Sequence, residues 1–308
     1  MAHGNGPRST RAPRTLRLTL QVLERTAPAR AAVLAEKLWF AVPPLAPTSR
    51  AARVTPSGGA PFFLMSGSSE ISGQSFGPEK GPLALLVHGW GGHWQQLAAH
   101  IPALVEAGYR VVAWDAPSHG RSTHSHLGQG RSSVLELTQA LVDVVDQMGT
   151  PSLVLAHSIA AMATLRAMRQ RDLGGQFVFF APDVRLEPAL DWFAGAVGMG
   201  PRTRELMTGK VLDDLGLDLA GFDLTRDVRR LAEQDMLPGL LVVHDLLDPD
   251  SPFAEGERLC ELWPGAELVR TEGLGHRAVI WDKEVVQKVA EHIAALPEPR
   301  PRGPRGLG

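Results

Sequence analysis

The sequence has very little cysteine and no long apolar run, and both shortages limit what the protein can be. Cys260 is the single cysteine, which excludes an internal disulfide and fits a reducing compartment, so we expect a cytoplasmic location. Its neighbours Leu259 and Leu262 indicate an ordinary buried thiol. Because no run reaches 18 apolar residues, no transmembrane helix is expected. The start also lacks the apolar core and cleavage site of a secretory signal.

Net positive charge is confined to the N-terminal region. Residues 1–53 carry nine Lys or Arg and two Glu, a net charge of +7, whereas residues 54–308 carry a net charge of −9. A nucleic-acid-binding surface needs positive charge to pair with phosphates. The acidic main part of the chain therefore argues against a nucleic-acid partner.

The two ends of the chain differ in composition from its middle. Residues 1–14 are rich in Gly, Pro, Ser and Arg and are predicted to be a disordered basic leader, and residues 297–308 a disordered tail. Residues 15–53 are predicted to form an N-terminal helical arm, broken at Pro28, because proline can begin a helix but disrupts its interior. Two interpretations of the arm stay open: packing on the main domain, or contact of its basic amphipathic face with an anionic membrane or a partner.

A regular alternation of apolar runs and helical patterns begins after residue 82. Five apolar runs and a weaker sixth predict strands at 83–87, 110–114, 152–156, 176–180, 239–243 and 267–271. Helical patterns lie between them, at 94–107, 133–148, 159–171, 252–263 and 282–296. Such an alternation predicts an α/β fold with a mostly parallel central sheet flanked by helices. The Pro- and Gly-broken stretch at 43–81 is expected to add antiparallel edge strands.

One connection is much longer than the others. About 58 residues separate the strands expected at 176–180 and 239–243, and helical patterns within them predict a helical cap at 182–235. Gly198 and Pro201 imply a bend between helices there. An insertion at this point projects from the carboxyl edge of the sheet, where open α/β folds bind ligands. The core domain is then expected to comprise residues 54–181 and 236–296.

A sharp turn between strand and helix is expected at Ser158, in the run S-L-V-L-A-H-S-I-A-A. The strand before it is continuously apolar, and the segment after it is rich in helix-forming residues. Such a turn crowds the positions two before and two after its central residue, which are the small Ala156 and Ala160. Ser158 is therefore the candidate nucleophile of a strained elbow.

A serine nucleophile needs a base, and the base needs a group that orients it. Asp248 follows the strand at 239–243 and His276 follows the strand at 267–271, so both lie at the edge where Ser158 emerges. Three other carboxylates compete with Asp248 for the role of acid; they are Asp245 and Asp250 in the same loop and Asp183 after the preceding strand. His292 is the other histidine beyond the last strand, but it lies in a helical pattern.

The oxyanion formed by attack on a carbonyl needs hydrogen-bond donors. The glycine-rich run His88 to Gly92 follows the first buried strand, and we assign one donor to the backbone N–H of Trp90. The second is assigned to the N–H of Ile159, which begins a helix whose dipole favours negative charge at that end.

With these parts in place, the sequence resembles the α/β-hydrolase fold family over roughly residues 83–296. The resemblance rests on H-G-W-G-G, D-A-P-S-H-G-R-S, A-H-S-I-A, D-L-L-D-P and G-L-G-H. It implies a Ser-Asp-His triad of Ser158, Asp248 and His276, with Trp90 and Ile159 as oxyanion-hole residues. Two departures are Ala for Gly on both sides of the elbow and Ser118 where Gly is usual; Asp115 and Gly120 match a turn that is mainly structural in the family.

Several histidines lie near these motifs. His88, Gly89, His93 and His157 are candidate residues of the substrate pocket. His119, His124 and His126 form a loop cluster, but without nearby Cys or a regular helical spacing we predict no metal site.

The function expected from these residues is a serine hydrolase that acts on a small carboxylic ester or related acyl substrate through an acyl-enzyme, with no cofactor. A serine rather than an aspartate nucleophile argues against epoxide hydrolase and haloalkane dehalogenase chemistry. Thioesterase, lactonase, C–C hydrolase, acyltransferase and perhydrolase activities remain open. The alternative from another class is a binding or scaffold protein that kept the fold without turnover.

Overall fold

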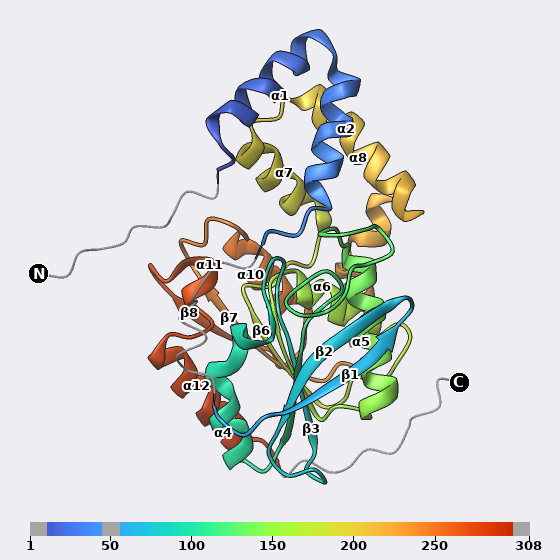
Figure 1. The fold of residues 1–308 in the computed structure, drawn as a ribbon. Coiled ribbons are helices and arrows are strands. Elements are labelled where there is room, and N and C mark those ends of the chain that lie inside the picture. The colour runs from blue at the N-terminus through green and yellow to red at the C-terminus, as the bar shows by residue number, and fades with distance from the viewer. Residues whose placement is uncertain (1–10, 45–55, 298–308) are drawn as a thin grey trace, which may run out of the picture.

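The computed structural model describes residues 11–44 and 56–297, and their centre is one eight-stranded sheet (Figure 1). The strands are β1 (Ala60–Ser66), β2 (Ser69–Phe76), β3 (Leu83–Val87), β4 (Arg110–Trp114), β5 (Leu153–His157), β6 (Gln176–Phe180), β7 (Gly239–Asp245) and β8 (Glu267–Thr271). Their order across the sheet is β1-β2-β4-β3-β5-β6-β7-β8. Residues 1–10 of the predicted leader, 45–53 of the predicted arm and 298–308 of the predicted tail lie outside the described residues. At the end of the predicted leader, Arg14 is the first residue of a helix, so the helical arm begins one residue earlier than predicted.

The sheet is parallel except at one edge. β1 and β2 form an antiparallel hairpin, and β2 pairs antiparallel with β4; the pairs from β4 through β8 are parallel. Every residue of β3 and β5 is buried, because helices cover both faces of these central strands. This confirms the predicted α/β fold and the antiparallel edge strands.

Two helical layers cover the sheet, each with its own apolar core. The layer of α5 (Val134–Met148), α6 (Ile159–Ala167) and α10 (Phe253–Leu262) packs on one face. The 3-10 helix η1 (Trp94–His100), α4 (Ile101–Glu106) and α12 (Lys283–Ala295) pack on the other. The short α11 (Gly275–Ala278) follows β8 at the carboxyl edge of the sheet.

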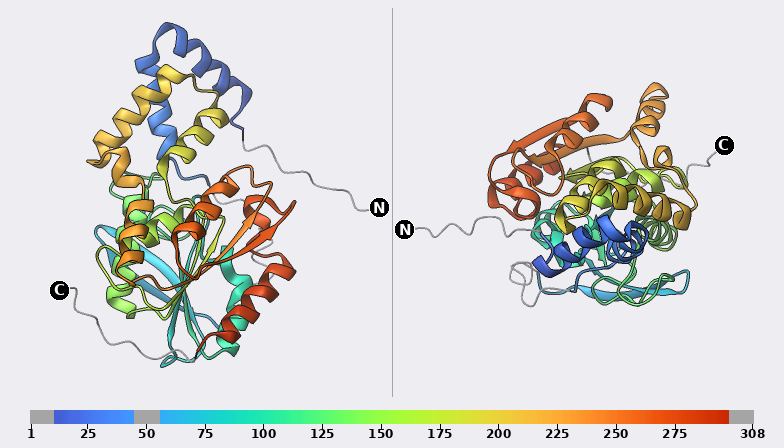
Figure 2. Two further views of the ribbon diagram at one scale, coloured as in Figure 1. Left: turned by 180° about the vertical axis from the view of Figure 1, so that it is seen from behind. Right: turned by 90° about the horizontal axis from the view of Figure 1, so that it is seen from above.

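Four further helices form a separate lobe that stands above the carboxyl edge of the sheet (Figures 1 and 2). This helical lobe consists of α1 (Arg14–Thr26), α2 (Pro28–Trp39), α7 (Leu186–Val197) and α8 (Pro201–Leu215). α2 packs along α8, and α1 packs on α2 and α7. The break between α1 and α2 falls at Ala27, and Pro28 is the first residue of α2, where its missing N–H costs nothing. The N-terminal arm therefore packs against the inserted helices rather than against the sheet.

Specific contacts hold the lobe together. The Trp39 ring meets the Phe193 ring edge to face at 5.2 Å between centroids. The Glu24 carboxylate accepts hydrogen bonds from the backbone N–H groups of Arg202 (3.1 Å) and Thr203 (3.0 Å). Because these N–H groups lack partners within α8, Glu24 on α1 caps a helix that is distant in the sequence.

The remainder of the segment expected as a cap, 182–235, returns to the body. The 3-10 helix η2 (Leu219–Phe222) and α9 (Thr225–Glu233) follow α8. Arg166 of α6 donates to the Gly221 carbonyl at 2.7 Å and lies over the Phe222 ring, and Arg169 pairs with Asp227. Of the predicted cap, α7 and α8 lie in the lobe, whereas η2 and α9 pack beside α6.

In the described part of the chain, no helix combines the length and apolar character needed to cross a membrane.

Candidate active site

Ser158 occupies a strained turn between β5 and α6. Its φ is 59° and its ψ is −126°, a conformation that a residue with a Cβ adopts only at a cost. Its backbone N–H donates to the Phe180 carbonyl at 2.9 Å, which holds the turn to the neighbouring strand β6. Ala156 and Ala160, on either side of it, are fully buried, so larger side chains have no room there. The turn has the geometry predicted from the sequence.

His276 and Asp248 meet Ser158 at the carboxyl edge of the sheet. Asp248 lies in the loop after β7, and His276 lies in α11 after β8. The Nε2 atom of His276 is 3.0 Å from Ser158 Oγ, and its Nδ1 atom is 2.8 Å from Asp248 Oδ2. The three predicted residues thus form one hydrogen-bonded chain from hydroxyl to imidazole to carboxylate.

Burial and charge along this chain shift the pKa values of its members. Burial alone would lower the pKa of His276, but the hydrogen bond and negative charge of Asp248, with a smaller contribution from Asp183, raise it. Burial alone would raise the pKa of Asp248, but hydrogen bonds to His244 and His276 hold it well below its usual range. Asp248 is therefore ionised at neutral pH and stabilises a positive charge on His276.

Of the competing carboxylates in the Asp248 loop, neither contacts His276. Asp245 is buried and accepts from the Thr271 hydroxyl at 2.8 Å and the Leu274 N–H at 2.9 Å, which fixes the start of the loop that carries His276. Asp250 accepts from the Trp192 indole N–H at 3.2 Å, which ties the Asp248 loop to α7 of the helical lobe. Both have structural partners of their own.

Asp183, the third competitor, lies on the other side of the serine. Its Oδ2 accepts from Ser158 Oγ at 3.2 Å and its Oδ1 from Ser251 Oγ at 2.7 Å. The Ser251 N–H in turn donates to Asp248 Oδ1 at 2.9 Å, so the two carboxylates are bridged by one residue. Burial raises the pKa of Asp183. The nucleophile candidate is therefore placed between an imidazole and a second, buried carboxylate.

Of the residues predicted as oxyanion donors, Ile159 directly follows the serine, and Trp90 follows Gly89, which lies against the elbow. Ile159 is the first residue of α6, where a helix has no internal acceptor for the N–H. Gly89, next to Trp90, packs so closely that an added Cβ would lie 2.6 Å from His157 Nδ1 and 3.2 Å from Ser158 Cβ. Only glycine fits this approach of the loop to the elbow. The Trp90 side chain turns away and donates from its indole to the Ala41 carbonyl at 3.1 Å.

The predicted pocket histidines have different environments. His88 is buried, accepts from the Ala116 N–H at 3.0 Å through Nε2, and has its pKa lowered to about 4 by burial, so it is a neutral part of the loop scaffold. His157 lies 4.6 Å from His276 between ring centroids, and its Nε2 is 2.9 Å from the His276 carbonyl oxygen. His93 lies near Asp115, and burial lowers its pKa. Of the three, His157 contacts the triad.

Three supporting residues were not identified from the sequence. Ser251 bridges the two carboxylates, His244 lies 3.5 Å from Asp248 Oδ2, and Gln96 accepts from the Gly89 N–H at 2.9 Å. Ser251 and His244 lie within four residues of Asp248 in the sequence, and this proximity is the signal that could have identified them. Gln96 lies in η1, where nothing in the pattern distinguishes it from a surface glutamine.

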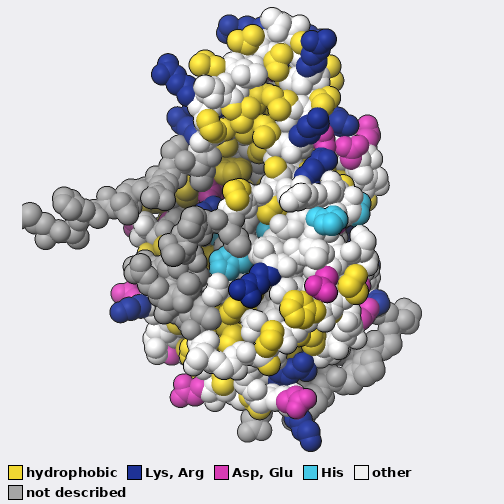
Figure 3. All heavy atoms as spheres, viewed as in Figure 1, with side chains coloured by type: hydrophobic (Ala, Val, Ile, Leu, Met, Phe, Trp, Pro, Cys, Tyr) yellow, Lys and Arg dark blue, Asp and Glu magenta, His cyan; other side chains and the backbone are white. Residues whose placement is uncertain are grey.

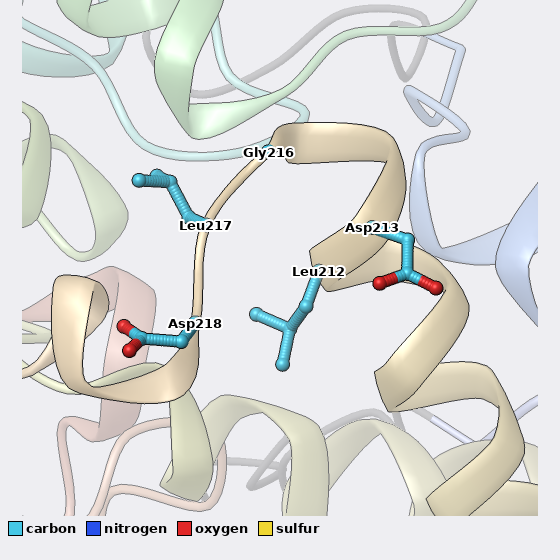
Figure 4. A pocket seen from close by; sticks show the side chains of 5 residues that line it. All are labelled: Leu212, Asp213, Gly216, Leu217 and Asp218. Atoms are coloured by element: carbon cyan, nitrogen blue, oxygen red, sulfur yellow. The ribbon is translucent and has the colours of Figure 1, made fainter.

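An open pocket of about 520 Å³ lies away from these residues, at the end of α8. Leu212, Asp213, Gly216, Leu217 and Asp218 line it, and the two carboxylates lie on opposite sides of it (Figure 4). None of the triad candidates contributes to its wall.

Within the described ranges, no group of three His, Cys, Asp or Glu side chains is arranged to hold a metal ion. The Asp115 turn is tied internally, because its carboxylate accepts from the N–H groups of Trp94 (2.7 Å) and Arg121 (2.9 Å).

Comparison with known proteins agrees with the architecture of the body. Residues 84–291 match the model of the alpha/beta hydrolase family. Among solved structures, an esterase from a Rhodococcus species superposes with a TM-score of 0.56 over 78% of this chain and 99% of that chain, at 17% identity. A likeness at that identity concerns the fold.

Curated relatives match shorter segments. Epoxide hydrolase B of Mycobacterium tuberculosis is 38% identical over 84 residues, which are 27% of this chain and 23% of that protein. The magnesium-chelatase 30 kDa subunit of Rhodobacter capsulatus is 30% identical over 127 residues, 40% of each chain. The chain thus spans well under half the length of the curated relatives that it matches.

Proposed function

Because this chain belongs to the alpha/beta hydrolase family and joins Ser158, His276 and Asp248 by hydrogen bonds, we propose that it is a serine hydrolase of small carboxylic esters or related acyl compounds. The observation that carries the proposal is the pair of distances at His276, 3.0 Å to Ser158 Oγ and 2.8 Å to Asp248 Oδ2. They fit the separations over which a proton passes between nucleophile and base.

In the first half of the reaction, Ser158 Oγ attacks the acyl carbon while His276 Nε2 accepts the hydroxyl proton. The carbonyl electron pair moves to oxygen, and the N–H groups of Trp90 and Ile159 stabilise this negative charge. When the tetrahedral intermediate collapses, the C–O bond to the leaving group breaks and His276 returns the proton to that group. An alcohol leaves and Ser158 carries the acyl group.

In the second half, a water molecule takes the place of the alcohol. His276 removes one proton from it as it attacks the acyl carbon, and collapse of the second intermediate releases the acid and restores the Ser158 hydroxyl. Asp248 remains ionised throughout and stabilises the imidazolium. The cycle needs no metal or organic cofactor.

Asp183 is a positioning residue in this proposal. Its Oδ2 lies 3.2 Å from Ser158 Oγ, so the single hydroxyl proton points either to Asp183 or to His276 Nε2, and the attack requires the orientation toward His276. The negative charge of Asp183 beside the imidazolium favours the protonated form of His276. Because Asp183 does not occupy the elbow, the nucleophile is the serine hydroxyl rather than a carboxylate, which supports acyl transfer over the opening of an epoxide.

Labelling with a fluorophosphonate probe tests the proposal. The probe should label the full-length protein, Ser158→Ala should abolish labelling, and His276→Ala should reduce it sharply. Circular dichroism spectra should show that both variants are folded. A folded but unlabelled protein would overturn the proposal and favour a non-catalytic binding role.

A screen of p-nitrophenyl esters of increasing acyl length, with thioesters and lactones alongside, would then define the acyl group. The cytoplasmic location expected from the sequence is part of the proposal and is tested by fractionation of the source cells.

A further inference from the structure

The exposed charges of α1 and α2 all have one sign. Arg14, Arg25, Arg30 and Lys37 are exposed, whereas the two acids of these helices are turned inward. Glu24 caps α8, and Glu36 is buried and pairs with Arg131 at 2.8 Å. The two carboxylates of the arm are therefore bound in internal contacts, whereas its exposed charged side chains are all positive.

Apolar side chains lie among these basic residues. Leu18, Val22 and Val33 are 50%, 60% and 43% exposed. On α1, Arg14, Leu18, Val22 and Arg25 follow at spacings of four, four and three residues, which places them on one face of the helix. On α2, Val33 lies three residues after Arg30 and four before Lys37. Each apolar side chain thus has a cation about one turn away.

The position of these helices leaves this surface accessible. Seen from above, α1 and α2 lie beside α7 and α8 and are not covered by other described elements (Figure 2). Figure 3 shows hydrophobic side chains gathered on the lobe, with Lys and Arg at the margin of that patch. The outward acids of the lobe, such as Glu205, belong to other helices.

We propose that this surface docks the protein on an anionic lipid bilayer. The basic–apolar surface, as we call it, is made of exposed side chains of α1 and α2; they are Arg14, Leu18, Val22, Arg25, Arg30, Val33 and Lys37. Apolar side chains that enter the interface between headgroups and acyl chains, with cations that pair with lipid phosphates, are the chemistry of peripheral membrane helices. Docking there would hold the lobe, and the carboxyl edge of the sheet below it, next to the lipid.

Sedimentation with vesicles tests the proposal on the full-length protein. We expect binding to vesicles of phosphatidylcholine with phosphatidylglycerol, little binding to phosphatidylcholine alone, and release as salt rises. Arg14→Gln/Arg25→Gln should lower the partition coefficient about fivefold for each arginine. Leu18→Gln/Val22→Gln should lower it roughly tenfold, because two inserted apolar side chains are lost.

Phe63→Gln/Met65→Gln is the matched control. These residues of β1 are 64% and 54% exposed and lie on the body, so the control should bind like the original protein. No sedimentation with anionic vesicles, or equal loss in the control, would overturn the proposal. So would concentration-dependent self-association without lipid that Leu18→Gln/Val22→Gln abolishes, since the surface would then bind a second copy.

A local readout separates docking from altered folding. With Cys260→Ser, a cysteine introduced by Val22→Cys and labelled with an environment-sensitive fluorophore should shift to shorter wavelength on addition of anionic vesicles. The same label introduced by Met65→Cys should not shift. A shift at both sites, or at neither, would contradict the proposed orientation. This experiment needs no enzymatic activity, so it fails or succeeds independently of the proposed reaction.

Discussion

The body and the helical lobe reach their structures by different kinds of contact. In the body, β3 and β5 are buried along their whole length, and both helical layers pack on the same sheet. In the lobe, α1 has a single buried residue, Leu20, and its outer face carries exposed Leu18 and Val22. The sheet of the body is therefore buried on both faces, whereas α1 lies at the periphery of a lobe whose buried residues belong mainly to α2, α7 and α8. The body holds the proposed triad, and the exposed face of α1 belongs to the surface that we propose docks on lipid.

The largest expected effect is the loss of the Ser158 hydroxyl in the body. Ser158→Ala should lower kcat by about 10⁴-fold or more, because no other group in the proposed mechanism can form the acyl-enzyme. The measurement is hydrolysis of the best p-nitrophenyl ester. Ser132→Ala is the matched control, since Ser132 is also a buried serine of the body. If activity survived in Ser158→Ala, the assignment of chemistry to the elbow would be wrong.

The next largest effect is expected from Asp248, the carboxylate of the proposed triad. Asp248→Asn should lower kcat by about 10³–10⁴-fold, because an amide cannot stabilise the imidazolium and favours the wrong tautomer of His276. Asp245→Asn, in the same loop, should instead lower the melting temperature and leave kcat much less changed, since Asp245 binds Thr271 and Leu274 rather than His276. A reversal of these two results would exchange the roles of the two aspartates.

A smaller effect is expected from the second carboxylate. The base must be neutral to accept a proton, so kcat rises with pH through the pKa of His276, which Asp248 and Asp183 raise. Asp183→Asn removes one source of that increase, so the acidic limb of the pH–rate profile should move to lower pH. The loss of kcat should be smaller than in Asp248→Asn. If the acidic limb of the Asp183→Asn profile stayed at the same pH as in the original protein, Asp183 would act on structure alone.

The smallest effect belongs to the lobe. Glu24→Ala removes the acceptor for the N–H groups of Arg202 and Thr203 and should destabilise the first turn of α8 by about 1 kcal/mol. Hydrogen exchange of these N–H groups should accelerate, while exchange in β3 and β5 stays unchanged. Glu205→Ala is the control, because Glu205 is an exposed residue of α8 itself. If exchange in the strands accelerated as well, the lobe and body would be one cooperative unit.

The sequence predicted the strands of the body closely. The runs at 83–87, 110–114 and 176–180 coincide with β3, β4 and β6, because strands buried on both faces are largely continuous apolar runs bounded by polar or turn residues. The weaker run at 267–271 coincides with β8, an edge strand that is only partly buried. The meeting of Ser158, Asp248 and His276 followed from the rule that parallel strands end at one edge. These inferences used local pattern and chain order, which the sequence contains.

Contacts between distant segments could not be read in the same way. The amphipathic spacing of α1 and α2 indicated that one face packs, but not that α2 would pack on α8. Asp183 was considered only as a rival acid, and its contact with Ser158 Oγ depends on the direction of the chain after β6. The bridge by Ser251 depends on a loop conformation that residue types alone do not fix.

The pairing of α2 with α8 also bears on how the chain is made. α2 ends at Trp39 and α8 begins at Pro201, so about 160 residues must be added before α2 can meet its partner. At roughly 5–20 residues per second, the ribosome needs about 10–30 s for that length. Throughout that interval, the apolar side chains of α2 that later pack on α8 have no partner. We expect a chaperone to bind them during that time.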